Sequence, residues 1–325
     1  MDYIFVFSGL LLLFIGGEAL VRGSVAISEK LGISAILIGV VVVGFGTSAP
    51  ELLVSVKASL DGKSDIALGN VVGSNIANIL FILGIAAIIC PVLCPAKAVR
   101  RDALAVLFSG LLLYLLTYSG EISRIYGILM LISLIAYLVY SYRSEIKEKR
   151  ELAAGKQHTV HEHEAQEFDS KTGIGLSIIM SVVGIAMLMF GADLLVDGAS
   201  NIARQFGISE AVIGLSLVAV GTSLPELATA ISASIKKNSD VIIGNVLGSN
   251  LFNVLSILGI TSIIKPVPMS GQIASFDIPL NLIIALITFV IIYKMQKISK
   301  ITGAIFLVGY VMYMGFLYSS GMVSG

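Results

Sequence analysis

The sequence predicts an all-α integral membrane protein, with ten transmembrane helices arranged as two inverted five-helix repeats. Its composition, the length of its apolar runs and an internal duplication support this prediction. Of the 325 residues, 56% are hydrophobic and 13% are charged, whereas soluble domains carry about 25% charged residues. A chain in lipid must satisfy its backbone polar groups internally, and these runs have helix length rather than the ~10-residue alternation of barrel strands.

Each predicted helix is an apolar run of the roughly 20 residues that cross a bilayer. The runs predict spans near 2–21, 33–58, 66–90, 102–119, 124–142, 172–196, 208–234, 241–263, 275–293 and 301–319. The first run lacks a basic leading segment and a small-residue cleavage site, so we expect it to be retained as a span. Cys90 and Cys94 end the third run, and we expect inert thiols because a structural zinc site needs four ligands.

A polar segment divides the chain. Residues 143–171 hold 13 of the 42 charged residues and all three histidines. We therefore expect a polar linker there, between a first five-helix repeat at 1–142 and a second, inverted repeat at 172–325. Its histidines and glutamates could bind a metal ion loosely, but a solvated hinge is the simpler interpretation.

Lysine and arginine are distributed unevenly between the predicted loops. The loops on the side of the linker carry 16 of them, and the loops on the other side carry 5. The positive-inside rule then predicts a multi-pass protein of the cell membrane, with both termini extracytoplasmic and the linker cytoplasmic. The acids and bases balance at 21 each, so the charge gives no reason to expect nucleic acid as a partner.

An internal duplication is the strongest organisational signal. At an offset of 175 residues and without a gap, 46–85 matches 221–260 at 22 of 40 positions. Because each half has an odd number of predicted spans, equivalent helices must cross the membrane in opposite directions. Inverted repeats are typical of secondary transporters, whose ion sites lie near the membrane midplane between the repeats.

The duplicated segments each place one carboxylate within a long apolar helix. They read Gly-Thr-Ser-Ala-Pro-Glu from Gly46 to Glu51 and Gly-Thr-Ser-Leu-Pro-Glu from Gly221 to Glu226. A charged side chain at mid-bilayer costs about 2.5 to 3.5 kcal/mol on insertion scales, so both acids need a partner. No lysine, arginine or histidine lies in the middle of a predicted helix, and we therefore expect a bound cation.

Oxygen atoms of neighbouring residues would complete this site. Thr47 and Ser48 stand four and three residues before Glu51, which predicts hydroxyls beside the carboxylate on one helix face. Pro50 has no amide hydrogen, so it should release the Gly46 carbonyl. The following helix of each half adds amides and hydroxyls at four-residue spacing: Asn70, Ser74 and Asn78, then Asn245, Ser249 and Asn253. Oxygen ligands of these kinds favour calcium or sodium over zinc or copper.

Some polar residues of these helices have two open interpretations. Asn70, Asn75, Asn245 and Asn250 could equally bridge helices or contact ions. Glu18 and Asp193 occupy equivalent positions near the ends of the first and sixth predicted spans, where an interfacial or gating role is expected. Packing alone does not explain Glu51 and Glu226.

At these motifs the sequence resembles the sodium/calcium exchanger branch of the cation/calcium exchanger superfamily, of the prokaryotic type with two alpha repeats. The similar motifs are Gly-Thr-Ser-x-Pro-Glu followed by Gly-Asn-x-x-Gly-Ser-Asn, which start at Gly46 and Gly69 and again at Gly221 and Gly244. The proton/calcium branch generally carries Gly-Asn-x-x-Glu, which this chain lacks. The resemblance covers essentially the whole chain.

The resemblance implies one calcium site flanked by sodium sites. Calcium would be bound by the carboxylates of Glu51 and Glu226 and by the backbone carbonyls of Thr47 and Thr222. One sodium site would comprise Ser48, Ser74, the Gly44 carbonyl and Glu226. Its mirror would comprise Ser223, Ser249, the Ala219 carbonyl and Glu51, and Asn78 and Asn253 would face the middle.

The implied function is secondary active antiport of sodium for calcium by alternating access, without enzymatic activity or cofactor. The transported sodium and calcium ions and the lipid bilayer are the only partners expected, and no obligatory protein partner is evident. Members that co-transport potassium carry Asp at the position of Asn253, so Asn here favours a potassium-independent exchanger. Another cation/calcium exchanger, a proton/calcium exchanger and a cation channel are the alternatives.

Overall fold

The structure is a computed structural model that describes residues 2–94, 97–153, 173–206, 221–269 and 271–319. The first half contains α1 (Asp2–Leu31), α2 (Ala35–Ile38), η1 (Gly39–Gly44), α3 (Phe45–Thr47), α4 (Ala49–Leu60), α5 (Ser64–Ala77), η2 (Asn78–Ile82), α6 (Leu83–Ile89), β1 (Val92–Leu93), α7 (Lys97–Leu116), η3 (Thr117–Ser119), β2 (Glu121–Ile122) and α8 (Arg124–Ala153). The second contains α9 (Ile174–Gln205), α12 (Leu224–Ile235), α13 (Ser239–Phe252), η5 (Asn253–Leu258), α14 (Gly259–Ile264), β3 (Val267–Pro268), η6 (Ile273–Asp277), α15 (Ile278–Met295), β4 (Lys297–Ile298) and α16 (Lys300–Ser319).

The described residues form a helical membrane protein. Eight of their helical stretches are long and apolar enough to cross a membrane. The pair Ala35–Thr47 and Ala49–Leu60, bent by 45°, makes a ninth if it is counted as one span. The span predicted at 208–234 contributes the shorter apolar helix α12, and residues 207–220 lie outside the described part. The predicted total of ten therefore remains a prediction.

Two helices extend beyond their predicted ends. α1 continues to Leu31 rather than 21, and α8 continues to Ala153 rather than 142. Hydropathy falls at these points, but each helix keeps a buried face, with Ser24 and Ser28 on α1 and Glu145 on α8. Packing against neighbouring helices therefore keeps the backbone helical where the apolar run ends.

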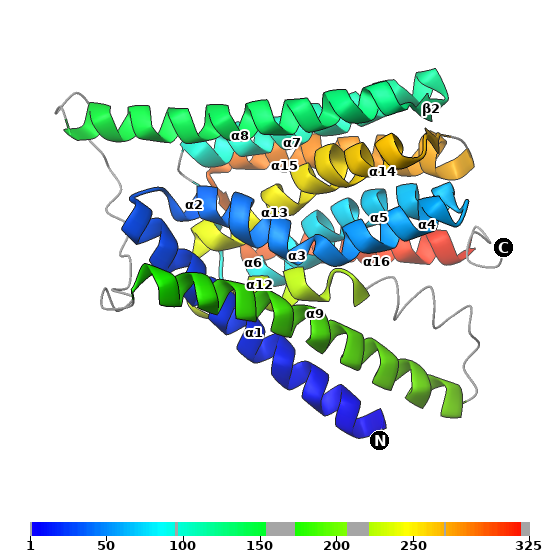
Figure 1. Ribbon diagram of the computed structural model, residues 1–325, viewed down its shortest axis with the longest axis horizontal. Coiled ribbons are helices and arrows are strands. Elements are labelled where there is room, and N and C mark those ends of the chain that lie inside the picture. Colours follow the sequence, from blue (N-terminus) through cyan, green and yellow to red (C-terminus); the bar gives the residue numbers. More distant parts are fainter. Residues whose placement is uncertain (1, 95–96, 154–172, 207–220, 270, 320–325) are drawn as a thin grey trace.

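α1 and α9 lie side by side and run obliquely to the other helices (Figure 1). Glycines allow this close approach: a Cβ atom at Gly16 would lie 2.9 Å from the Gly184 carbonyl oxygen, and one at Gly9 would lie 2.7 Å from the Gly191 carbonyl oxygen. The contact is symmetric under the 175-residue offset, because Gly184 and Gly191 are the equivalents of Gly9 and Gly16. Small residues of this kind bring membrane helices into direct backbone contact.

Two short antiparallel strand pairs connect the halves. In one pair Val92 of β1 lies opposite Ile298 of β4, and in the other Glu121 of β2 lies opposite Pro268 of β3. β3 is β1 displaced by the 175-residue offset. The hydrophobic pattern does not predict these strands, since two residues are too short a window to show an alternation.

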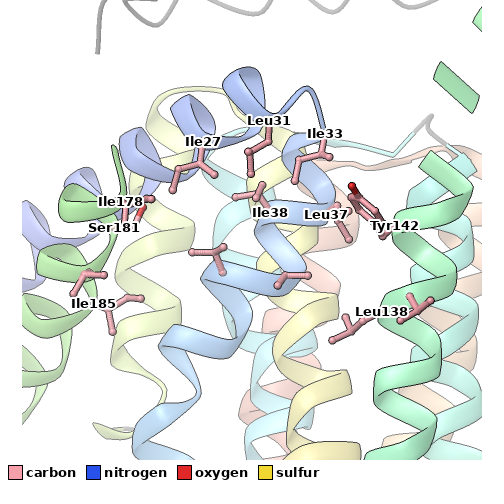
Figure 2. Close-up of a pocket in the computed structure, with 14 residues that line it drawn as sticks. Ile27, Leu31, Ile33, Leu37, Ile38, Leu138, Tyr142, Ile178, Ser181 and Ile185 are labelled. Atoms are coloured by element: carbon pink, nitrogen blue, oxygen red, sulfur yellow. The ribbon is translucent and has the colours of Figure 1, made fainter. Parts of the chain in front are cut away.

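An apolar crevice of about 610 Å³ separates the α1–α9 pair from α2, η1 and α8 (Figure 2). Its walls include Ile27, Leu37, Leu138 and Ile185, and Ser181 and Tyr142 are its polar lining residues. Among the described residues this wall contains two hydroxyl groups and no carboxylate or side-chain amide, so the crevice is poorly suited to binding a cation.

Candidate cation site

The helical segments that carry the two acids are broken next to them. α3 ends at Thr47 and α4 begins at Ala49, with Ser48 at φ −83° and ψ 7° between them. Ser223 has nearly the same conformation, with φ −92° and ψ 6°, immediately before α12. In both helices the proline lies in the first turn, where its missing amide hydrogen removes no helical bond. The proline thus starts a new helix rather than distorting a continuous one.

Glu51 and Glu226 lie in the first turns of α4 and α12, and each is only 1% exposed. The N-terminal end of a helix stabilises negative charge through its free amide groups. Each carboxylate also accepts a hydrogen bond from the other half of the chain. Ser48 Oγ donates to Glu226 Oε1 over 3.2 Å, and Ser223 Oγ donates to Glu51 Oε1 over 3.3 Å.

This crossed arrangement corrects one prediction. The spacing of Ser48 and Glu51 predicts a hydroxyl beside the carboxylate of its own helix, but the Ser48 hydroxyl donates to Glu226. The interruption at Ser48 is the physical reason, since it ends the regular three- and four-residue geometry on which the prediction depends. Thr47 Oγ1 is likewise directed elsewhere, to the Val43 carbonyl over 3.0 Å and to Asn245 Oδ1 over 3.3 Å.

Asparagine side chains hold α5 and α13 together in the centre of the molecule. Asn75 Nδ2 donates to the Asn250 carbonyl, and Asn250 Nδ2 donates to the Asn75 carbonyl. Their side-chain oxygens accept from the next pair: Asn78 Nδ2 donates to Asn250 Oδ1, and Asn253 Nδ2 donates to Asn75 Oδ1, both over 3.0 Å. For Asn75 and Asn250, the hydrogen bonds of the structure therefore support helix bridging.

Asn70 and Asn245 bridge neighbouring helices as well. Asn70 Nδ2 donates to the backbone carbonyl of Glu51 over 3.2 Å, and Asn245 Nδ2 donates to that of Glu226 over 3.3 Å. These amides fix the acidic helix turns against α5 and α13. The 175-residue offset relates the two contacts to each other.

Five buried oxygens of this region have no hydrogen-bond partner. They are Glu51 Oε2, Glu226 Oε2, Asn78 Oδ1, Asn253 Oδ1 and Thr222 Oγ1. Within the described residues no lysine or arginine forms an ion pair with Glu51 or Glu226. Buried carboxylates without a partner are costly, so this set of oxygens is suited to a cation that supplies positive charge to several ligands at once.

The chemistry of the ligands selects the kind of cation. In the part of the chain that the structure describes, no three His, Cys, Asp or Glu side chains come together as a conventional metal centre. Carboxylate, amide, hydroxyl and carbonyl oxygens are the donors that hard cations such as calcium prefer. The site therefore fits a calcium or sodium ion better than a transition metal.

Further predicted ligands contact each other, in pairs that differ from those the resemblance implies. Ser223 Oγ lies 3.4 Å from Ser74 Oγ, and Ser249 Oγ donates to the Gly44 carbonyl over 3.4 Å. The resemblance places Ser74 with Gly44 instead, and Ser249 with Ser223. Ala219 lies outside the described residues.

Comparison with known proteins gives concordant results. Residues 2–143 and 176–319 match the family described as sodium/calcium exchanger protein. The putative antiporter CaxA of Alkalimonas amylolytica is 34% identical over 98% of both chains, and the sodium/calcium exchanger MaX1 of Methanosarcina acetivorans is 30% identical over 98% of this chain and 99% of its own. A solved structure of the sodium-calcium exchanger NCX_Mj, soaked with zero Na⁺ and Ca²⁺, superimposes with a TM-score of 0.83 at 30% identity, covering 97% of this chain and 98% of that one.

Proposed function

We propose, from the premise that this chain belongs to the sodium/calcium exchanger family, that sodium and calcium alternate in one buried oxygen cluster that opens to each side of the membrane in turn. The protein is a sodium/calcium antiporter, and its family is one of transporters rather than enzymes. One observation carries the proposed site: two carboxylates, each 1% exposed, have one oxygen bound by a serine of the opposite half and the other oxygen without a partner.

The calcium position in this proposal lies between the two acids. Glu51 and Glu226 together balance the charge of one divalent ion, and the backbone carbonyls of Thr47 and Thr222 complete the ligands on either side. The unpartnered amide oxygens of Asn78 and Asn253 support a cation position between the two halves. A neutral amide at Asn253 adds no charge to the cluster, which favours potassium-independent exchange.

Sodium ions would occupy positions that flank calcium. Their proposed ligands are Ser48, Ser74, the Gly44 carbonyl and Glu226 on one side, and Ser223, Ser249, the Ala219 carbonyl and Glu51 on the other. Because several sodium ions carry more positive charge than two carboxylates balance, the sodium and calcium forms differ in net charge. Moving one elementary charge across 100 mV is worth about 2.3 kcal/mol, so we infer that transport is electrogenic.

The proposed architecture is ten spans in two inverted repeats, 1–142 and 172–325, with the polar segment 143–171 between them. The reciprocal contacts across the 175-residue offset support it, as Ser48 and Ser223 each donate to the acid of the other half. The lysine and arginine count of 16 against 5 supports extracytoplasmic termini and a cytoplasmic linker. Sliding of the α1–α9 pair over the other helices would open the site alternately.

Calcium-45 uptake into sodium-loaded proteoliposomes tests this proposal. Glu51→Gln and Glu226→Gln should each abolish uptake, because each removes half of the balancing charge, and folding should be little affected. Asp277→Asn is the matched control: Asp277 is 4% exposed and accepts a hydrogen bond from Tyr313 outside the site, so its variant should retain uptake. Wild-type uptake by either glutamine variant would refute the site, and an absolute requirement for potassium would refute the assignment of Asn253.

A further inference from the structure

An ion-pair cluster connects α1 to the end of α12, away from the cation site. Glu18 of α1 pairs with Lys236 Nζ over 2.5 Å and with Arg22 Nε over 2.5 Å. Its second oxygen accepts a hydrogen bond from Ser232 Oγ over 3.1 Å. We call these four residues, Glu18, Arg22, Ser232 and Lys236, the α1–α12 latch.

The latch lies where the two helices are already closely packed. A Cβ atom at Gly17 would lie 3.0 Å from the Ala228 carbonyl oxygen of α12, so the backbones are in direct contact next to Glu18. The Lys236 side chain is 13% exposed and that of Glu18 is 28% exposed. Moving α1 along α12 would separate these charges and leave each partly buried without its partner, which is unfavourable.

The duplication does not repeat this cluster. At an offset of 175 residues, Glu18 corresponds to Asp193, Arg22 to Asp197, and Lys236 to Asp61. Two of the three charges are thus reversed, and the equivalents cannot form the same ion pairs. Asp193 is exposed and has no ion pair within the described residues. The ion pairs that join α1 to α12 therefore have no equivalent at the corresponding positions of the other half.

We propose that the α1–α12 latch sets the balance between the two access states of the exchanger, with Glu18 and Lys236 as positioning residues that favour the arrangement seen here. This inference rests on the proposed sliding of α1 and α9. In the proposed topology α1 and α12 both end on the side of the membrane where the linker begins, α1 at Leu31 and α12 at Ile235, immediately before Lys236. The latch closes that side, and breaking it should increase access to the site from there.

Accessibility of a buried residue of α1 gives a readout that does not depend on transport. Ser24 is fully buried six residues after Glu18 on α1, and Ser24→Cys is nearly isosteric. The Ser24→Cys variant is made in a background with Cys90→Ser and Cys94→Ser. A membrane-impermeant methanethiosulfonate applied from the linker side should modify its introduced thiol slowly. Adding Lys236→Met should raise the modification rate by about fivefold or more, the usual lower range of coupling between two states.

A double-mutant cycle separates the latch from a general loss of stability. Glu18→Gln and Lys236→Met should each raise the rate, and the double variant should raise it no further, because one interaction is removed in all three. Lys236→Arg should restore the slow rate. The adjacent Lys237→Met is the control of equal charge, since Lys237 is exposed and has no ion pair with Glu18.

Transport kinetics in the same proteoliposomes complete the test. The ratio of calcium KM values on the two sides should shift with Lys236→Met but not with Lys237→Met, while the melting temperatures of the two variants stay similar. Equal modification rates and equal KM ratios in these variants would overturn the latch. Failure of the proposed exchange is a separate result, because wild-type protein would then take up no calcium whatever its modification rate.

Discussion

Asn75 and Asn250 are bound to each other in a reciprocal pair at the centre of the molecule. The side-chain amide of Asn75 donates to the Asn250 carbonyl over 3.2 Å, and that of Asn250 donates to the Asn75 carbonyl over 3.4 Å. Both residues are at most 2% exposed. Each helix therefore satisfies a side chain of the other, and α5 and α13 cannot separate without leaving buried amides unpaired.

Asn75→Ala should destabilise the protein more than removal of an asparagine near the surface. The change deletes the donor to Asn250 and the acceptor for Asn253, and each buried group left unsatisfied costs about 1–3 kcal/mol. Asn201→Ala, which removes a partly exposed contact to Asp2, is the control. Thermal unfolding in detergent measures both variants, and equal melting temperatures would contradict the bridging role.

Ser48→Ala and Ser223→Ala should weaken sodium dependence more than calcium binding. Each removes one hydroxyl that donates to a carboxylate of the opposite half, and a monovalent ion depends more on such neutral ligands. The measurement is the sodium concentration for half-maximal exchange, beside the calcium KM. Ser133→Ala on the exposed face of α8 should change neither. Equal losses for both ions would argue against serine as a sodium ligand.

Gly191→Ala should impair both stability and exchange. The new Cβ atom would lie 2.9 Å from the Leu13 amide nitrogen and 3.0 Å from the Gly9 carbonyl oxygen, so α1 and α9 must move apart. Overpacking of this kind typically costs about 1–3 kcal/mol. Gly175→Ala on the same helix meets no neighbouring atom and should be neutral or slightly stabilising, because alanine favours helix. If both variants unfold alike, close α1–α9 contact is unimportant.

Cys94 should resist alkylation up to about pH 9. Burial, aided by the charge of Asp240, raises the pKa of the Cys94 thiol to about 12, and the side chain is 0% exposed. The reactive thiolate would then be roughly one molecule in a thousand at pH 9, and reactivity should rise only as the pH approaches the pKa. Iodoacetamide labelling of Cys90→Ser against Cys94→Ser from pH 7 to 10 measures this. Rapid labelling of Cys94 at pH 8 would show that the thiol is accessible.

The sequence predicts the helical membrane fold because long apolar runs admit few other structures in lipid. It also predicts that Glu51 and Glu226 need a common partner, since both lie within such runs. It does not predict that Ser48 donates to Glu226, because helical spacing describes neighbours on one helix and the chain is broken at that serine. The pairing between halves is a tertiary property.

The extended ends of α1 and α8 also escape sequence reasoning. Hydropathy marks the apolar part of a helix, whereas packing determines where the helix stops. Glu145 illustrates this, because it is charged and lies in the predicted linker, yet it is only 6% exposed. Its two carboxylate oxygens accept hydrogen bonds from the backbone amide and the hydroxyl of Ser34. A buried acceptor for a helix N-cap is visible only once both helices are placed.

The strand pairs β1–β4 and β2–β3 give the protein an uneven resistance to local opening. They join chain segments next to α6, α7, α8, α14, α15 and α16, whereas among the described residues no strand adjoins α1 or α9. Amide hydrogens are protected from exchange with solvent according to how cooperatively their segment opens. Deuterium should therefore exchange into the outer turns of α1 and α9 long before it exchanges into the backbone amides of Val92 and Ile122. The helices next to the strand pairs would then open slowly, and α1 and α9 would open readily.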